Sequence, residues 1–149
     1  MYVHTKKDND MFNQCIYFNL SSLTRQITKI WQDEFVVLGL SPSHGYVLFA
    51  LAHNPDASQK DLSEIMELDA STITRFVDAL VAKKLIAKDR AGKGARYSLT
   101  AEGEALAKRV NGVMDGLLGH MSQTFGAQQF DDFVGQVRRA KQIVKDIET

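Results

Sequence analysis

Two helical patterns separated by a very short break constrain this chain more than any other feature. The first begins at Ser58, where Asp61 forms an approximate capping box, and it ends near Met66. After the three residues Glu67-Leu68-Asp69, a second pattern runs from Ala70 to Lys84, with apolar side chains on one face at Ile73, Phe76, Val77 and Leu80. Two helices joined by so short a turn, with Leu68 as its apolar residue, predict a helix-turn-helix.

The open face of the second helix carries small hydroxyl residues and a cation. Ser71, Thr72, Thr74, Arg75 and Asp78 are left facing outward by the apolar spacing. Small hydroxyls at a helix N-terminus let the backbone approach a phosphate, and an arginine can reach a guanine edge. The plainer interpretation, a solvated face of an amphipathic helix, stands beside this one. We expect the residues to form the recognition helix of a DNA-binding protein.

Positive charge gathers locally although the chain as a whole is neutral. The formal net charge is zero, so composition alone does not indicate a nucleic-acid partner. Between residues 75 and 96, however, seven basic residues stand against two acidic ones. They lie in the recognition helix and in the segment directly after it, so we expect a basic surface there: Arg75, Lys83, Lys84, Lys88, Arg90, Lys93 and Arg96.

The rest of the chain is mostly helical by the same criteria. Ser41-Pro42 is a helix start, the following stretch GYVLFALAH is apolar nearly all round, and Thr100 caps a further helix. We therefore predict a mainly α fold with a small β-hairpin wing. Its expected parts are six helices, at about 12–38, 42–53, 58–66, 70–84, 101–125 and after Gly126, and strands Leu85–Arg90 and Arg96–Leu99 around Gly92-Lys93-Gly94.

Length and composition agree with one domain. The chain has 149 residues, of which 44% are apolar and 24% charged, as in an ordinary globular protein. No apolar run approaches the ~20 residues of a membrane span, and the N-terminus lacks a signal peptide's apolar stretch, so we expect no membrane partner. The single cysteine fits the reducing cytoplasm, where we expect the protein to act.

The motif around the recognition helix resembles the MarR family of bacterial winged helix-turn-helix regulators. The resemblance is dense over residues 58–106, in the segments DLSEIMELDASTITRFVDALVAKKLIAKD and YSLTAEGEAL. Met66 stands where the family pattern has an aliphatic residue. The matching positions are Leu62, Met66, Asp69, Ser71, Thr72, Thr74, Arg75, Val77, Asp78, Leu80, Lys84, Leu85, Ile86, Leu99, Thr100 and Gly103.

This resemblance implies a single MarR-type domain that works as a homodimer on DNA. Residues of about 41–100 would form the winged helix-turn-helix, flanked by dimerisation helices at about 11–38 and 101–148. Two-fold symmetry would place two recognition helices on a pseudo-palindromic operator of double-stranded DNA. The residues expected at the DNA are Ser58, Gln59, Ser71, Thr72, Thr74, Arg75, Lys83, Arg90, Lys93 and Arg96. The alternative is a winged-helix module for protein contacts, without sequence-specific DNA binding.

The wing departs from the family pattern. Relatives carry Asp-x-Arg in a longer wing whose arginine enters the minor groove, whereas here Asp89-Arg90 lies before a short tip with Lys93. A lysine at a mobile tip acts as a point charge rather than as a planar fork. We therefore expect Lys93 and Arg96 to bind phosphates more than to read bases.

Relatives of this kind act as repressors that a small ligand or an oxidant releases. Cys15 resembles the sensing cysteine of the hydroperoxide-responsive branch, but the sequence puts no cation within one turn of it. A small buried residue at a dimer interface is the alternative. For a small aromatic effector, Trp31, Phe35, His44 and Tyr46 are the pocket candidates, although aromatics at helical spacing are more often core.

Nothing in the sequence indicates an enzyme. It contains no nucleophile elbow, no phosphate-binding glycine loop after a strand and no paired carboxylates in an expected cleft. The remaining histidines, His4, His53 and His120, show no metal-ligand spacing with one another or with Cys15. We therefore expect no catalytic residues, no metal and no cofactor.

Overall fold

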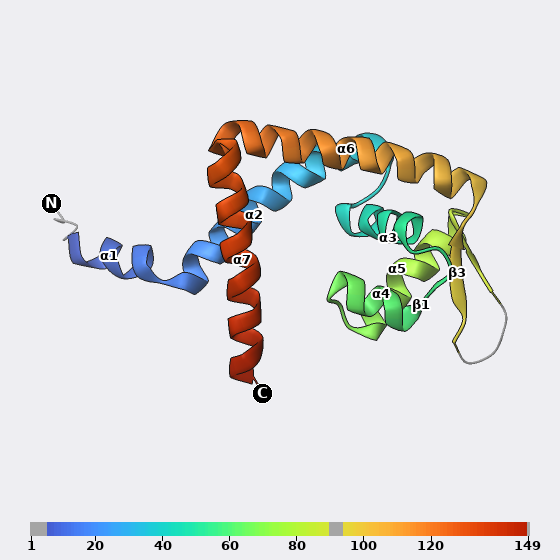
Figure 1. Ribbon diagram of the computed structural model, residues 1–149, viewed down its shortest axis with the longest axis horizontal. Coiled ribbons are helices and arrows are strands. Elements are labelled where there is room, and N and C mark those ends of the chain that lie inside the picture. Colours follow the sequence, from blue (N-terminus) through green and yellow to red (C-terminus); the bar gives the residue numbers. More distant parts are fainter. Residues whose placement is uncertain (1–5, 90–93, 149) are drawn as a thin grey trace, which may run out of the picture.

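The computed structural model describes residues 6–89 and 94–148. Long helices form one part of the molecule and a compact lobe of short helices and strands forms the other (Figure 1). The predicted fold class, mainly α with a winged helix-turn-helix, is confirmed. In chain order the described residues form α1 (Lys6–Gln14), α2 (Ile16–Phe35), a 3-10 turn η1 (Val36–Leu38), α3 (Pro42–His53), β1 (Ala57–Ser58), α4 (Gln59–Met66), α5 (Ala70–Ala82), β2 (Ile86–Lys88), β3 (Arg96–Leu99), α6 (Ala101–Phe125) and α7 (Ala127–Glu148).

Helix α3 lies at the centre of the lobe, as its uniformly apolar sequence predicts. Ser41 caps it through its Oγ, which accepts the His44 N–H at 3.3 Å, and Pro42 occupies the first turn. Val47, Leu48 and Leu51 are buried among α4, α5, α6 and the strands. Phe35 at the end of α2 packs against Gly45, where a Cβ would lie 2.3 Å from the ring. Glycine at this position therefore lets α2 end directly on α3.

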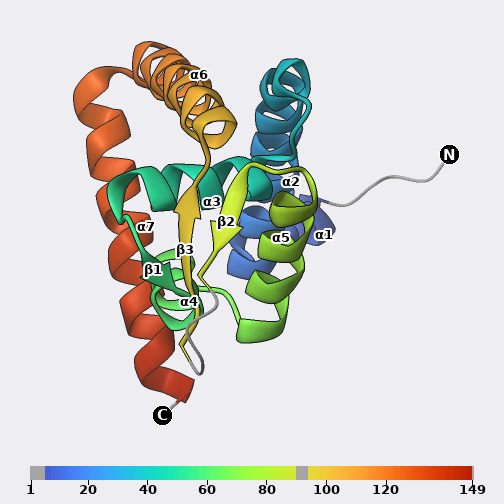
Figure 2. The ribbon, with the colours of Figure 1, turned by 90° about the vertical axis from the view of Figure 1, so that its right-hand side faces the viewer.

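The wing is a three-stranded antiparallel sheet in the order β1-β3-β2 (Figure 2). The strand at Ala57–Ser58 was not predicted, because two residues are too few to show an alternating pattern. In the sheet, Ala57 pairs with Tyr97 and Ile86 pairs with Leu99. Buried Ala57, Ile86 and Tyr97 attach the wing to the core.

The first predicted helix is in fact two helices. The chain breaks at Cys15, which has extended backbone angles (φ −78°, ψ 113°) and caps α2. The Asn19 side chain explains the break, because its Nδ2 donates to the Phe12 and Asn13 carbonyls at 3.1 and 2.9 Å. These are carbonyls that a continuous helix would pair internally. The described residues therefore hold seven α-helices where six were predicted.

Two other predicted boundaries are wrong. The recognition helix ends at Ala82 rather than at Lys84, because Lys84 adopts a left-handed conformation with φ 60°. The strand that follows is limited to Ile86–Lys88 instead of Leu85–Arg90. The tight turn at Lys84 accounts for the earlier end of the helix and the later start of the strand, because it brings the chain back onto the core.

No single helix among the described residues is long and apolar enough to cross a membrane. One pair, Ile16–Leu38 with Pro42–His53, meets the length and composition requirement when its members are joined, but it is bent by 70°.

The start of α6 is held against the turn between α5 and β2. Thr100 donates its hydroxyl to the Lys84 carbonyl at 2.7 Å and accepts the Gly103 N–H at 3.1 Å. A Cβ on Gly103 would lie 1.9 Å from the Leu85 carbonyl oxygen. Residue 103 must therefore be glycine for α6 to approach this closely.

We expect Gly103→Ala to lower the free energy of unfolding by about 1–3 kcal/mol, because the backbone at Leu85 would have to move. Gly119→Ala on the same helix is the matched control, since no atom lies within 4 Å of a Cβ there. It should raise stability by about 0.5–1 kcal/mol through helix propensity. Denaturant unfolding measures both values, and equal effects at the two sites would contradict the close approach.

Candidate nucleic-acid interface

Helix α4 begins with a complete capping box, as the sequence predicts. Ser58 Oγ accepts the Asp61 N–H at 3.1 Å, and the Asp61 carboxylate accepts the Ser58 N–H at 2.8 Å. These donors favour the charged carboxylate, so the Ser58 backbone and hydroxyl lower the pKa of Asp61. The cap fixes the point at which the chain leaves β1 and enters the helix-turn-helix.

The turn between α4 and α5 depends on one left-handed residue and one apolar residue. Glu67 has φ 53° and closes α4, with its N–H bonded to the Ser63 carbonyl. Leu68 packs partly buried against the core, which confirms its predicted role, and the Ser63 hydroxyl donates to its carbonyl. This arrangement sets the angle between the two helices.

The predicted recognition helix is capped by Asp69 and divided cleanly into two faces. The Asp69 carboxylate accepts the Thr72 N–H at 2.7 Å and the Ser71 hydroxyl at 2.8 Å. These bonds, the Thr72 N–H first, lower the pKa of Asp69. The side chains turned inward are Ile73, Val77 and Leu80, which are fully or almost fully buried; Phe76 and Thr72 are half-buried, and Ser71, Thr74, Arg75 and Asp78 are exposed.

Gln59 connects the two helices across this exposed face. Its Nε2 donates to the Ala70 carbonyl at 2.9 Å and to Thr74 Oγ1 at 2.7 Å. Thr74 Oγ1 in turn donates to the Ala70 carbonyl at 2.9 Å. The structure thus brings together predicted site residues from both helices: Ser58, Gln59, Ser71, Thr72, Thr74 and Arg75.

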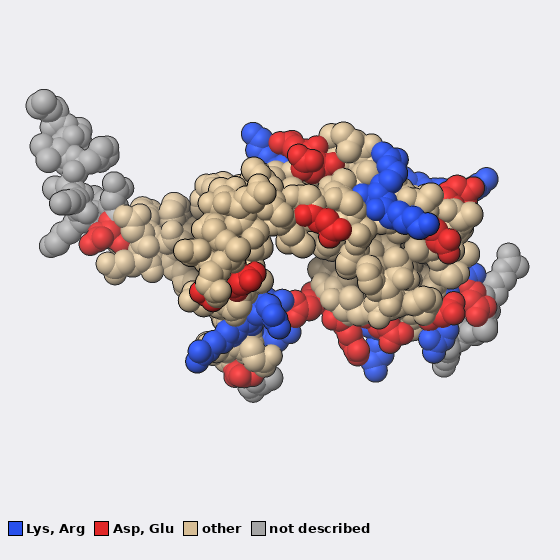
Figure 3. All heavy atoms as spheres, turned by 45° about the horizontal axis from the view of Figure 1, so that its top comes forward, with Lys and Arg blue, Asp and Glu red and all other residues tan. Residues whose placement is uncertain are grey.

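The basic residues after α5 are less concentrated than the sequence suggests. Arg96 Nη1 donates to the Asp56 carbonyl at 2.9 Å, so this guanidinium is turned onto the loop before β1. Lys83 is exposed at the end of α5, while Arg90 and Lys93 lie outside the described residues. Acidic side chains lie among the basic ones around the lobe (Figure 3). Arg75 is thus the exposed cation of the recognition helix itself.

The C-terminal helix contacts the helix-turn-helix through ion pairs that the sequence did not indicate. The Glu67 carboxylate lies 2.5 Å from Lys141 Nζ and 2.9 Å from Lys145 Nζ, both on α7. These pairs join α7 to the turn that follows α4. The two ammonium groups lower the pKa of Glu67 to about 2. The partners are more than 70 residues apart in the chain, so no local pattern could have revealed the contact.

Three of the four predicted effector residues contact one another, whereas the fourth, His44, contacts other side chains. Phe35 is fully buried and stacks on Tyr46, with ring centroids 6.4 Å apart. Trp31 Nε1 donates to Tyr46 Oη at 3.1 Å. His44 lies edge-on to Phe76 and forms a hydrogen bond with Ser41 Oγ at 2.7 Å. Burial, and after it the charge of Lys83, lowers the pKa of His44.

Tyr46 also lines a cavity of about 450 Å³ between α3 and α4, with Phe49, His53 and Met66.

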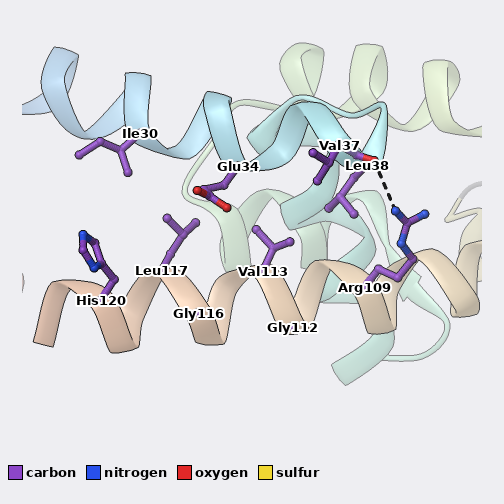
Figure 4. A pocket seen from close by; sticks show the side chains of 10 residues that line it. All are labelled: Ile30, Glu34, Val37, Leu38, Arg109, Gly112, Val113, Gly116, Leu117 and His120. Atoms are coloured by element: carbon purple, nitrogen blue, oxygen red, sulfur yellow. Dashed lines mark hydrogen bonds between the residues drawn. The ribbon is translucent and has the colours of Figure 1, made fainter. Parts of the chain in front are cut away.

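A cavity of about 660 Å³ between α2 and α6 was missed (Figure 4). Gly112 and Gly116 form its floor, since nothing lies within 4 Å of a Cβ at either residue. Ile30, Leu117 and His120 line one end, and Arg109 lies at the other, donating to the Val37 carbonyl at 3.3 Å. Glycines four residues apart on a helix were the available signal, because they remove side chains from one face.

Cys15 is exposed and lies at the break between α1 and α2. Its Sγ accepts the Phe18 N–H at 3.5 Å. The alternative, burial at a dimer interface, needs a second copy of the chain and stays a prediction. Among the described residues, no three His, Cys, Asp or Glu side chains gather in a way that can hold a metal ion.

Comparisons with known proteins agree with this geometry. The sequence model of the MarR family matches residues 38–96, and no curated protein sequence matches the chain. A putative MarR family transcriptional regulator from Listeria monocytogenes, complexed with 26mer DNA, is 19% identical, with a TM-score of 0.76 over 89% of this chain and 91% of that one. The repressor CouR, bound to a 23-mer DNA duplex, is 14% identical, with a TM-score of 0.81 over 95% and 99%.

A third similar structure holds a ligand. The PcaV transcriptional regulator from Streptomyces coelicolor, in complex with its natural ligand, is 23% identical, with a TM-score of 0.72 over 80% of this chain and 89% of that one. At sequence identities below 25%, the similarity to these three structures shows that this chain shares their fold. Together with the matching family model, they confirm the resemblance found in the sequence.

The Glu67 ion pairs predict a pH dependence with a definite sign. Because the folded-state pKa is about 2 and the ordinary value is 4.5, the stabilisation is present above about pH 4.5 and is lost as the pH falls towards 2. A carboxyl titration by NMR should place the Glu67 midpoint near 2 and, in Lys141→Ala/Lys145→Ala, near its ordinary value. Lys60→Ala, which removes a cation from α4, should leave the curve unchanged. A Glu67 midpoint that stays the same in the double variant would show that α7 does not make this contact.

Proposed function

We propose that this chain, which carries the winged helix-turn-helix of the MarR family over residues 38–96, is a sequence-specific regulator of transcription that binds double-stranded DNA. The observation that carries the proposal is the exposed face of α5, where Arg75 stands beside hydroxyl side chains on a helix capped at its start. Two solved structures of the same fold are bound to DNA. A regulator acts where the DNA is, so we place it in the cytoplasm, and we assign it no catalytic role.

On the DNA, α5 enters the major groove and the wing lies beside it. Arg75 reads a guanine edge as a bidentate donor, and the first turn of α5 approaches a phosphate. Lys83 supplies a phosphate contact from the end of the helix. Arg96, which is bonded to the Asp56 carbonyl, holds the base of the wing, and Arg90 and Lys93 remain proposed phosphate contacts.

The working unit is a homodimer formed by the long helices. Large apolar side chains on α1, α2 and α7 are open to water in one chain, including Met11 at 72%, Tyr17 at 80% and Ile147 at 78% exposure. Apolar patches of this kind mark protein interfaces. A second copy covers them through residues 11–38 and 101–148, so that two lobes of residues 41–100 face successive major grooves about one helical turn apart.

A small ligand releases this repressor from DNA. The similar regulator from Streptomyces coelicolor was solved with its natural ligand, and this chain offers a cavity lined by Tyr46 between α3 and α4 of the lobe. A small aromatic molecule fits the ring-rich wall that Tyr46 and Phe49 provide. Cys15, exposed at the start of α2, remains the candidate for release by an oxidant.

Binding to an operator selected from random DNA tests the function. Arg75→Ala should weaken operator binding by about 1–3 kcal/mol and relax preference at one base pair in each half-site, because a bidentate contact is lost. Arg139→Ala, which removes the same charge from α7, should leave that preference unchanged. Fluorescence anisotropy with matched and mismatched duplexes gives both values.

The same experiment distinguishes the alternative. Sedimentation of the complex should give two chains for each operator. A wild-type chain that enriches no sequence would favour the protein-contact module, and an equal loss on specific and random DNA in Arg75→Ala would show that Arg75 touches only phosphate.

Trp31 reports on the effector site, because it is the single tryptophan and bonds to Tyr46. Benzoate, as a probe for small aromatic acids, should change Trp31 emission and weaken operator binding by about fivefold or more, the usual range of such coupling. Tyr46→Phe, which breaks the hydrogen bond, should lose the emission change. If Gly112→Leu, which fills the α2–α6 cavity, blocks benzoate instead, the ligand occupies that cavity.

A further inference from the structure

The hydrogen bonds on the exposed face of α4 and α5 determine which chemical groups remain for DNA. A glutamine amide has two N–H donors and one carbonyl acceptor. In Gln59 both donors are used, one on the Ala70 carbonyl at 2.9 Å and one on Thr74 Oγ1 at 2.7 Å. The Ala70 carbonyl can only accept, so it also fixes the amide orientation, since a flipped amide would place two acceptors together. Gln59 therefore presents its carbonyl oxygen.

The hydroxyl groups beside Gln59 also donate their hydrogen atoms to partners within the protein. Thr74 has one O–H, which it donates to the Ala70 carbonyl at 2.9 Å, and it accepts from Gln59. Ser71 donates its O–H to Asp69 Oδ1 at 2.8 Å. Thr74 keeps one lone pair and a methyl group, and its side chain is exposed. Of these side chains, only Arg75 still has donors to offer.

This inventory excludes several partners for Gln59 and Thr74. Phosphate oxygens and the major-groove edge of guanine are acceptors only, so neither residue can hydrogen-bond to them. Gln59 also cannot form the usual two-point contact with adenine, which needs a donor as well as an acceptor. The acceptor of Gln59 suits an amino group on the DNA, and the methyl group of Thr74 suits another methyl group. In the major groove only an A·T pair presents both an amino group and a methyl group.

We propose that Gln59 and Thr74 act together as specificity-determining residues that select an A·T base pair in each half-site. Gln59 Oε1 accepts the adenine N6 amino group, and the Thr74 methyl group contacts the thymine methyl group. A C·G pair offers an amino group but no methyl group, so it satisfies only half of the surface. The inference rests on the proposed function, in which Arg75 reads a guanine. It assigns a second base pair of the half-site to Gln59 and Thr74.

Removing one chemical group at a time from the DNA tests the two contacts separately. In the operator selected by the wild-type chain, deoxyuridine in place of the thymine removes one methyl group. This change should weaken binding about fourfold, the equivalent of about 0.8 kcal/mol for one buried methyl group. Purine in place of the adenine removes the N6 amino group and should weaken binding about fivefold, as for one hydrogen bond.

The protein variants should remove each effect in turn. Thr74→Ser keeps the hydroxyl but loses the methyl group, so it should bind thymine and deoxyuridine operators equally and still discriminate against purine. Gln59→Met keeps the side-chain length without an acceptor, so it should lose the discrimination against purine. Thr124→Ser is the matched control, because Thr124 on α6 makes the same bond to the carbonyl four residues earlier, at 2.8 Å, away from this face.

The outcomes separate this inference from the function on which it rests. A wild-type chain that enriches no sequence overturns both. Two outcomes overturn the inference alone. In one, the wild-type chain selects a specific half-site, but no A·T pair in it changes its effect on binding in Thr74→Ser. In the other, the wild type and both variants discriminate equally against the deoxyuridine and purine operators. Circular dichroism of each variant confirms that the fold is retained before affinities are compared.

Discussion

The close packing around α3 is the constraint on which the other elements depend. This helix is apolar on nearly every side, so it is stable only when other elements surround it. Phe35 closes one side against Gly45, while α4, α5, the strands and α6 cover the rest. The helix-turn-helix is therefore not a free unit but one wall of the same core. Anything that moves α3 also moves the recognition helix.

Within that wall, local hydrogen bonds give the recognition surface its form. Ser58 and Asp69 cap successive helices, and the Gln59 amide joins α4 to the first turn of α5. Each of the two caps satisfies a backbone N–H that the helix leaves without an internal partner. The bonds also consume donors, which leaves Arg75 as the main donor and makes the rest of the face rich in acceptors. A surface arranged before binding loses less conformational entropy when it meets its target.

Two separate contacts join the long helices α6 and α7 to the lobe. Gly103 lets α6 approach the Leu85 carbonyl, and Lys141 and Lys145 of α7 hold Glu67 in the turn of the helix-turn-helix. The first contact is steric and close, whereas the second is ionic and exposed, and therefore weaker and sensitive to salt. The cavity beside Tyr46 is lined by Met66 and Leu68, which flank Glu67 in the chain, so a ligand there would lie close to the second contact.

Local chemistry in the sequence determined much of this protein. The caps at Ser41, Ser58, Asp69 and Thr100, the apolar spacing of α5 and the motif that resembles the MarR family all lie within a few residues of one another, so the helix-turn-helix and its exposed face could be predicted. The ends of two helices were predicted wrongly. The Asn19 side chain and the left-handed Lys84 interrupt helices that the apolar periodicity would continue.

Only the tertiary structure decided the features that join distant residues. The strand at Ala57–Ser58 exists because Arg96 and Tyr97 lie opposite it, and the Arg96 guanidinium turns to Asp56 rather than outward. The α2–α6 cavity and the Glu67 ion pairs likewise need segments that are far apart in the chain. Apolar periodicity and capping patterns in the sequence indicate contacts only between residues within about two helical turns of each other. Which donors are already occupied, and which charges meet, depends on the packing of the whole chain.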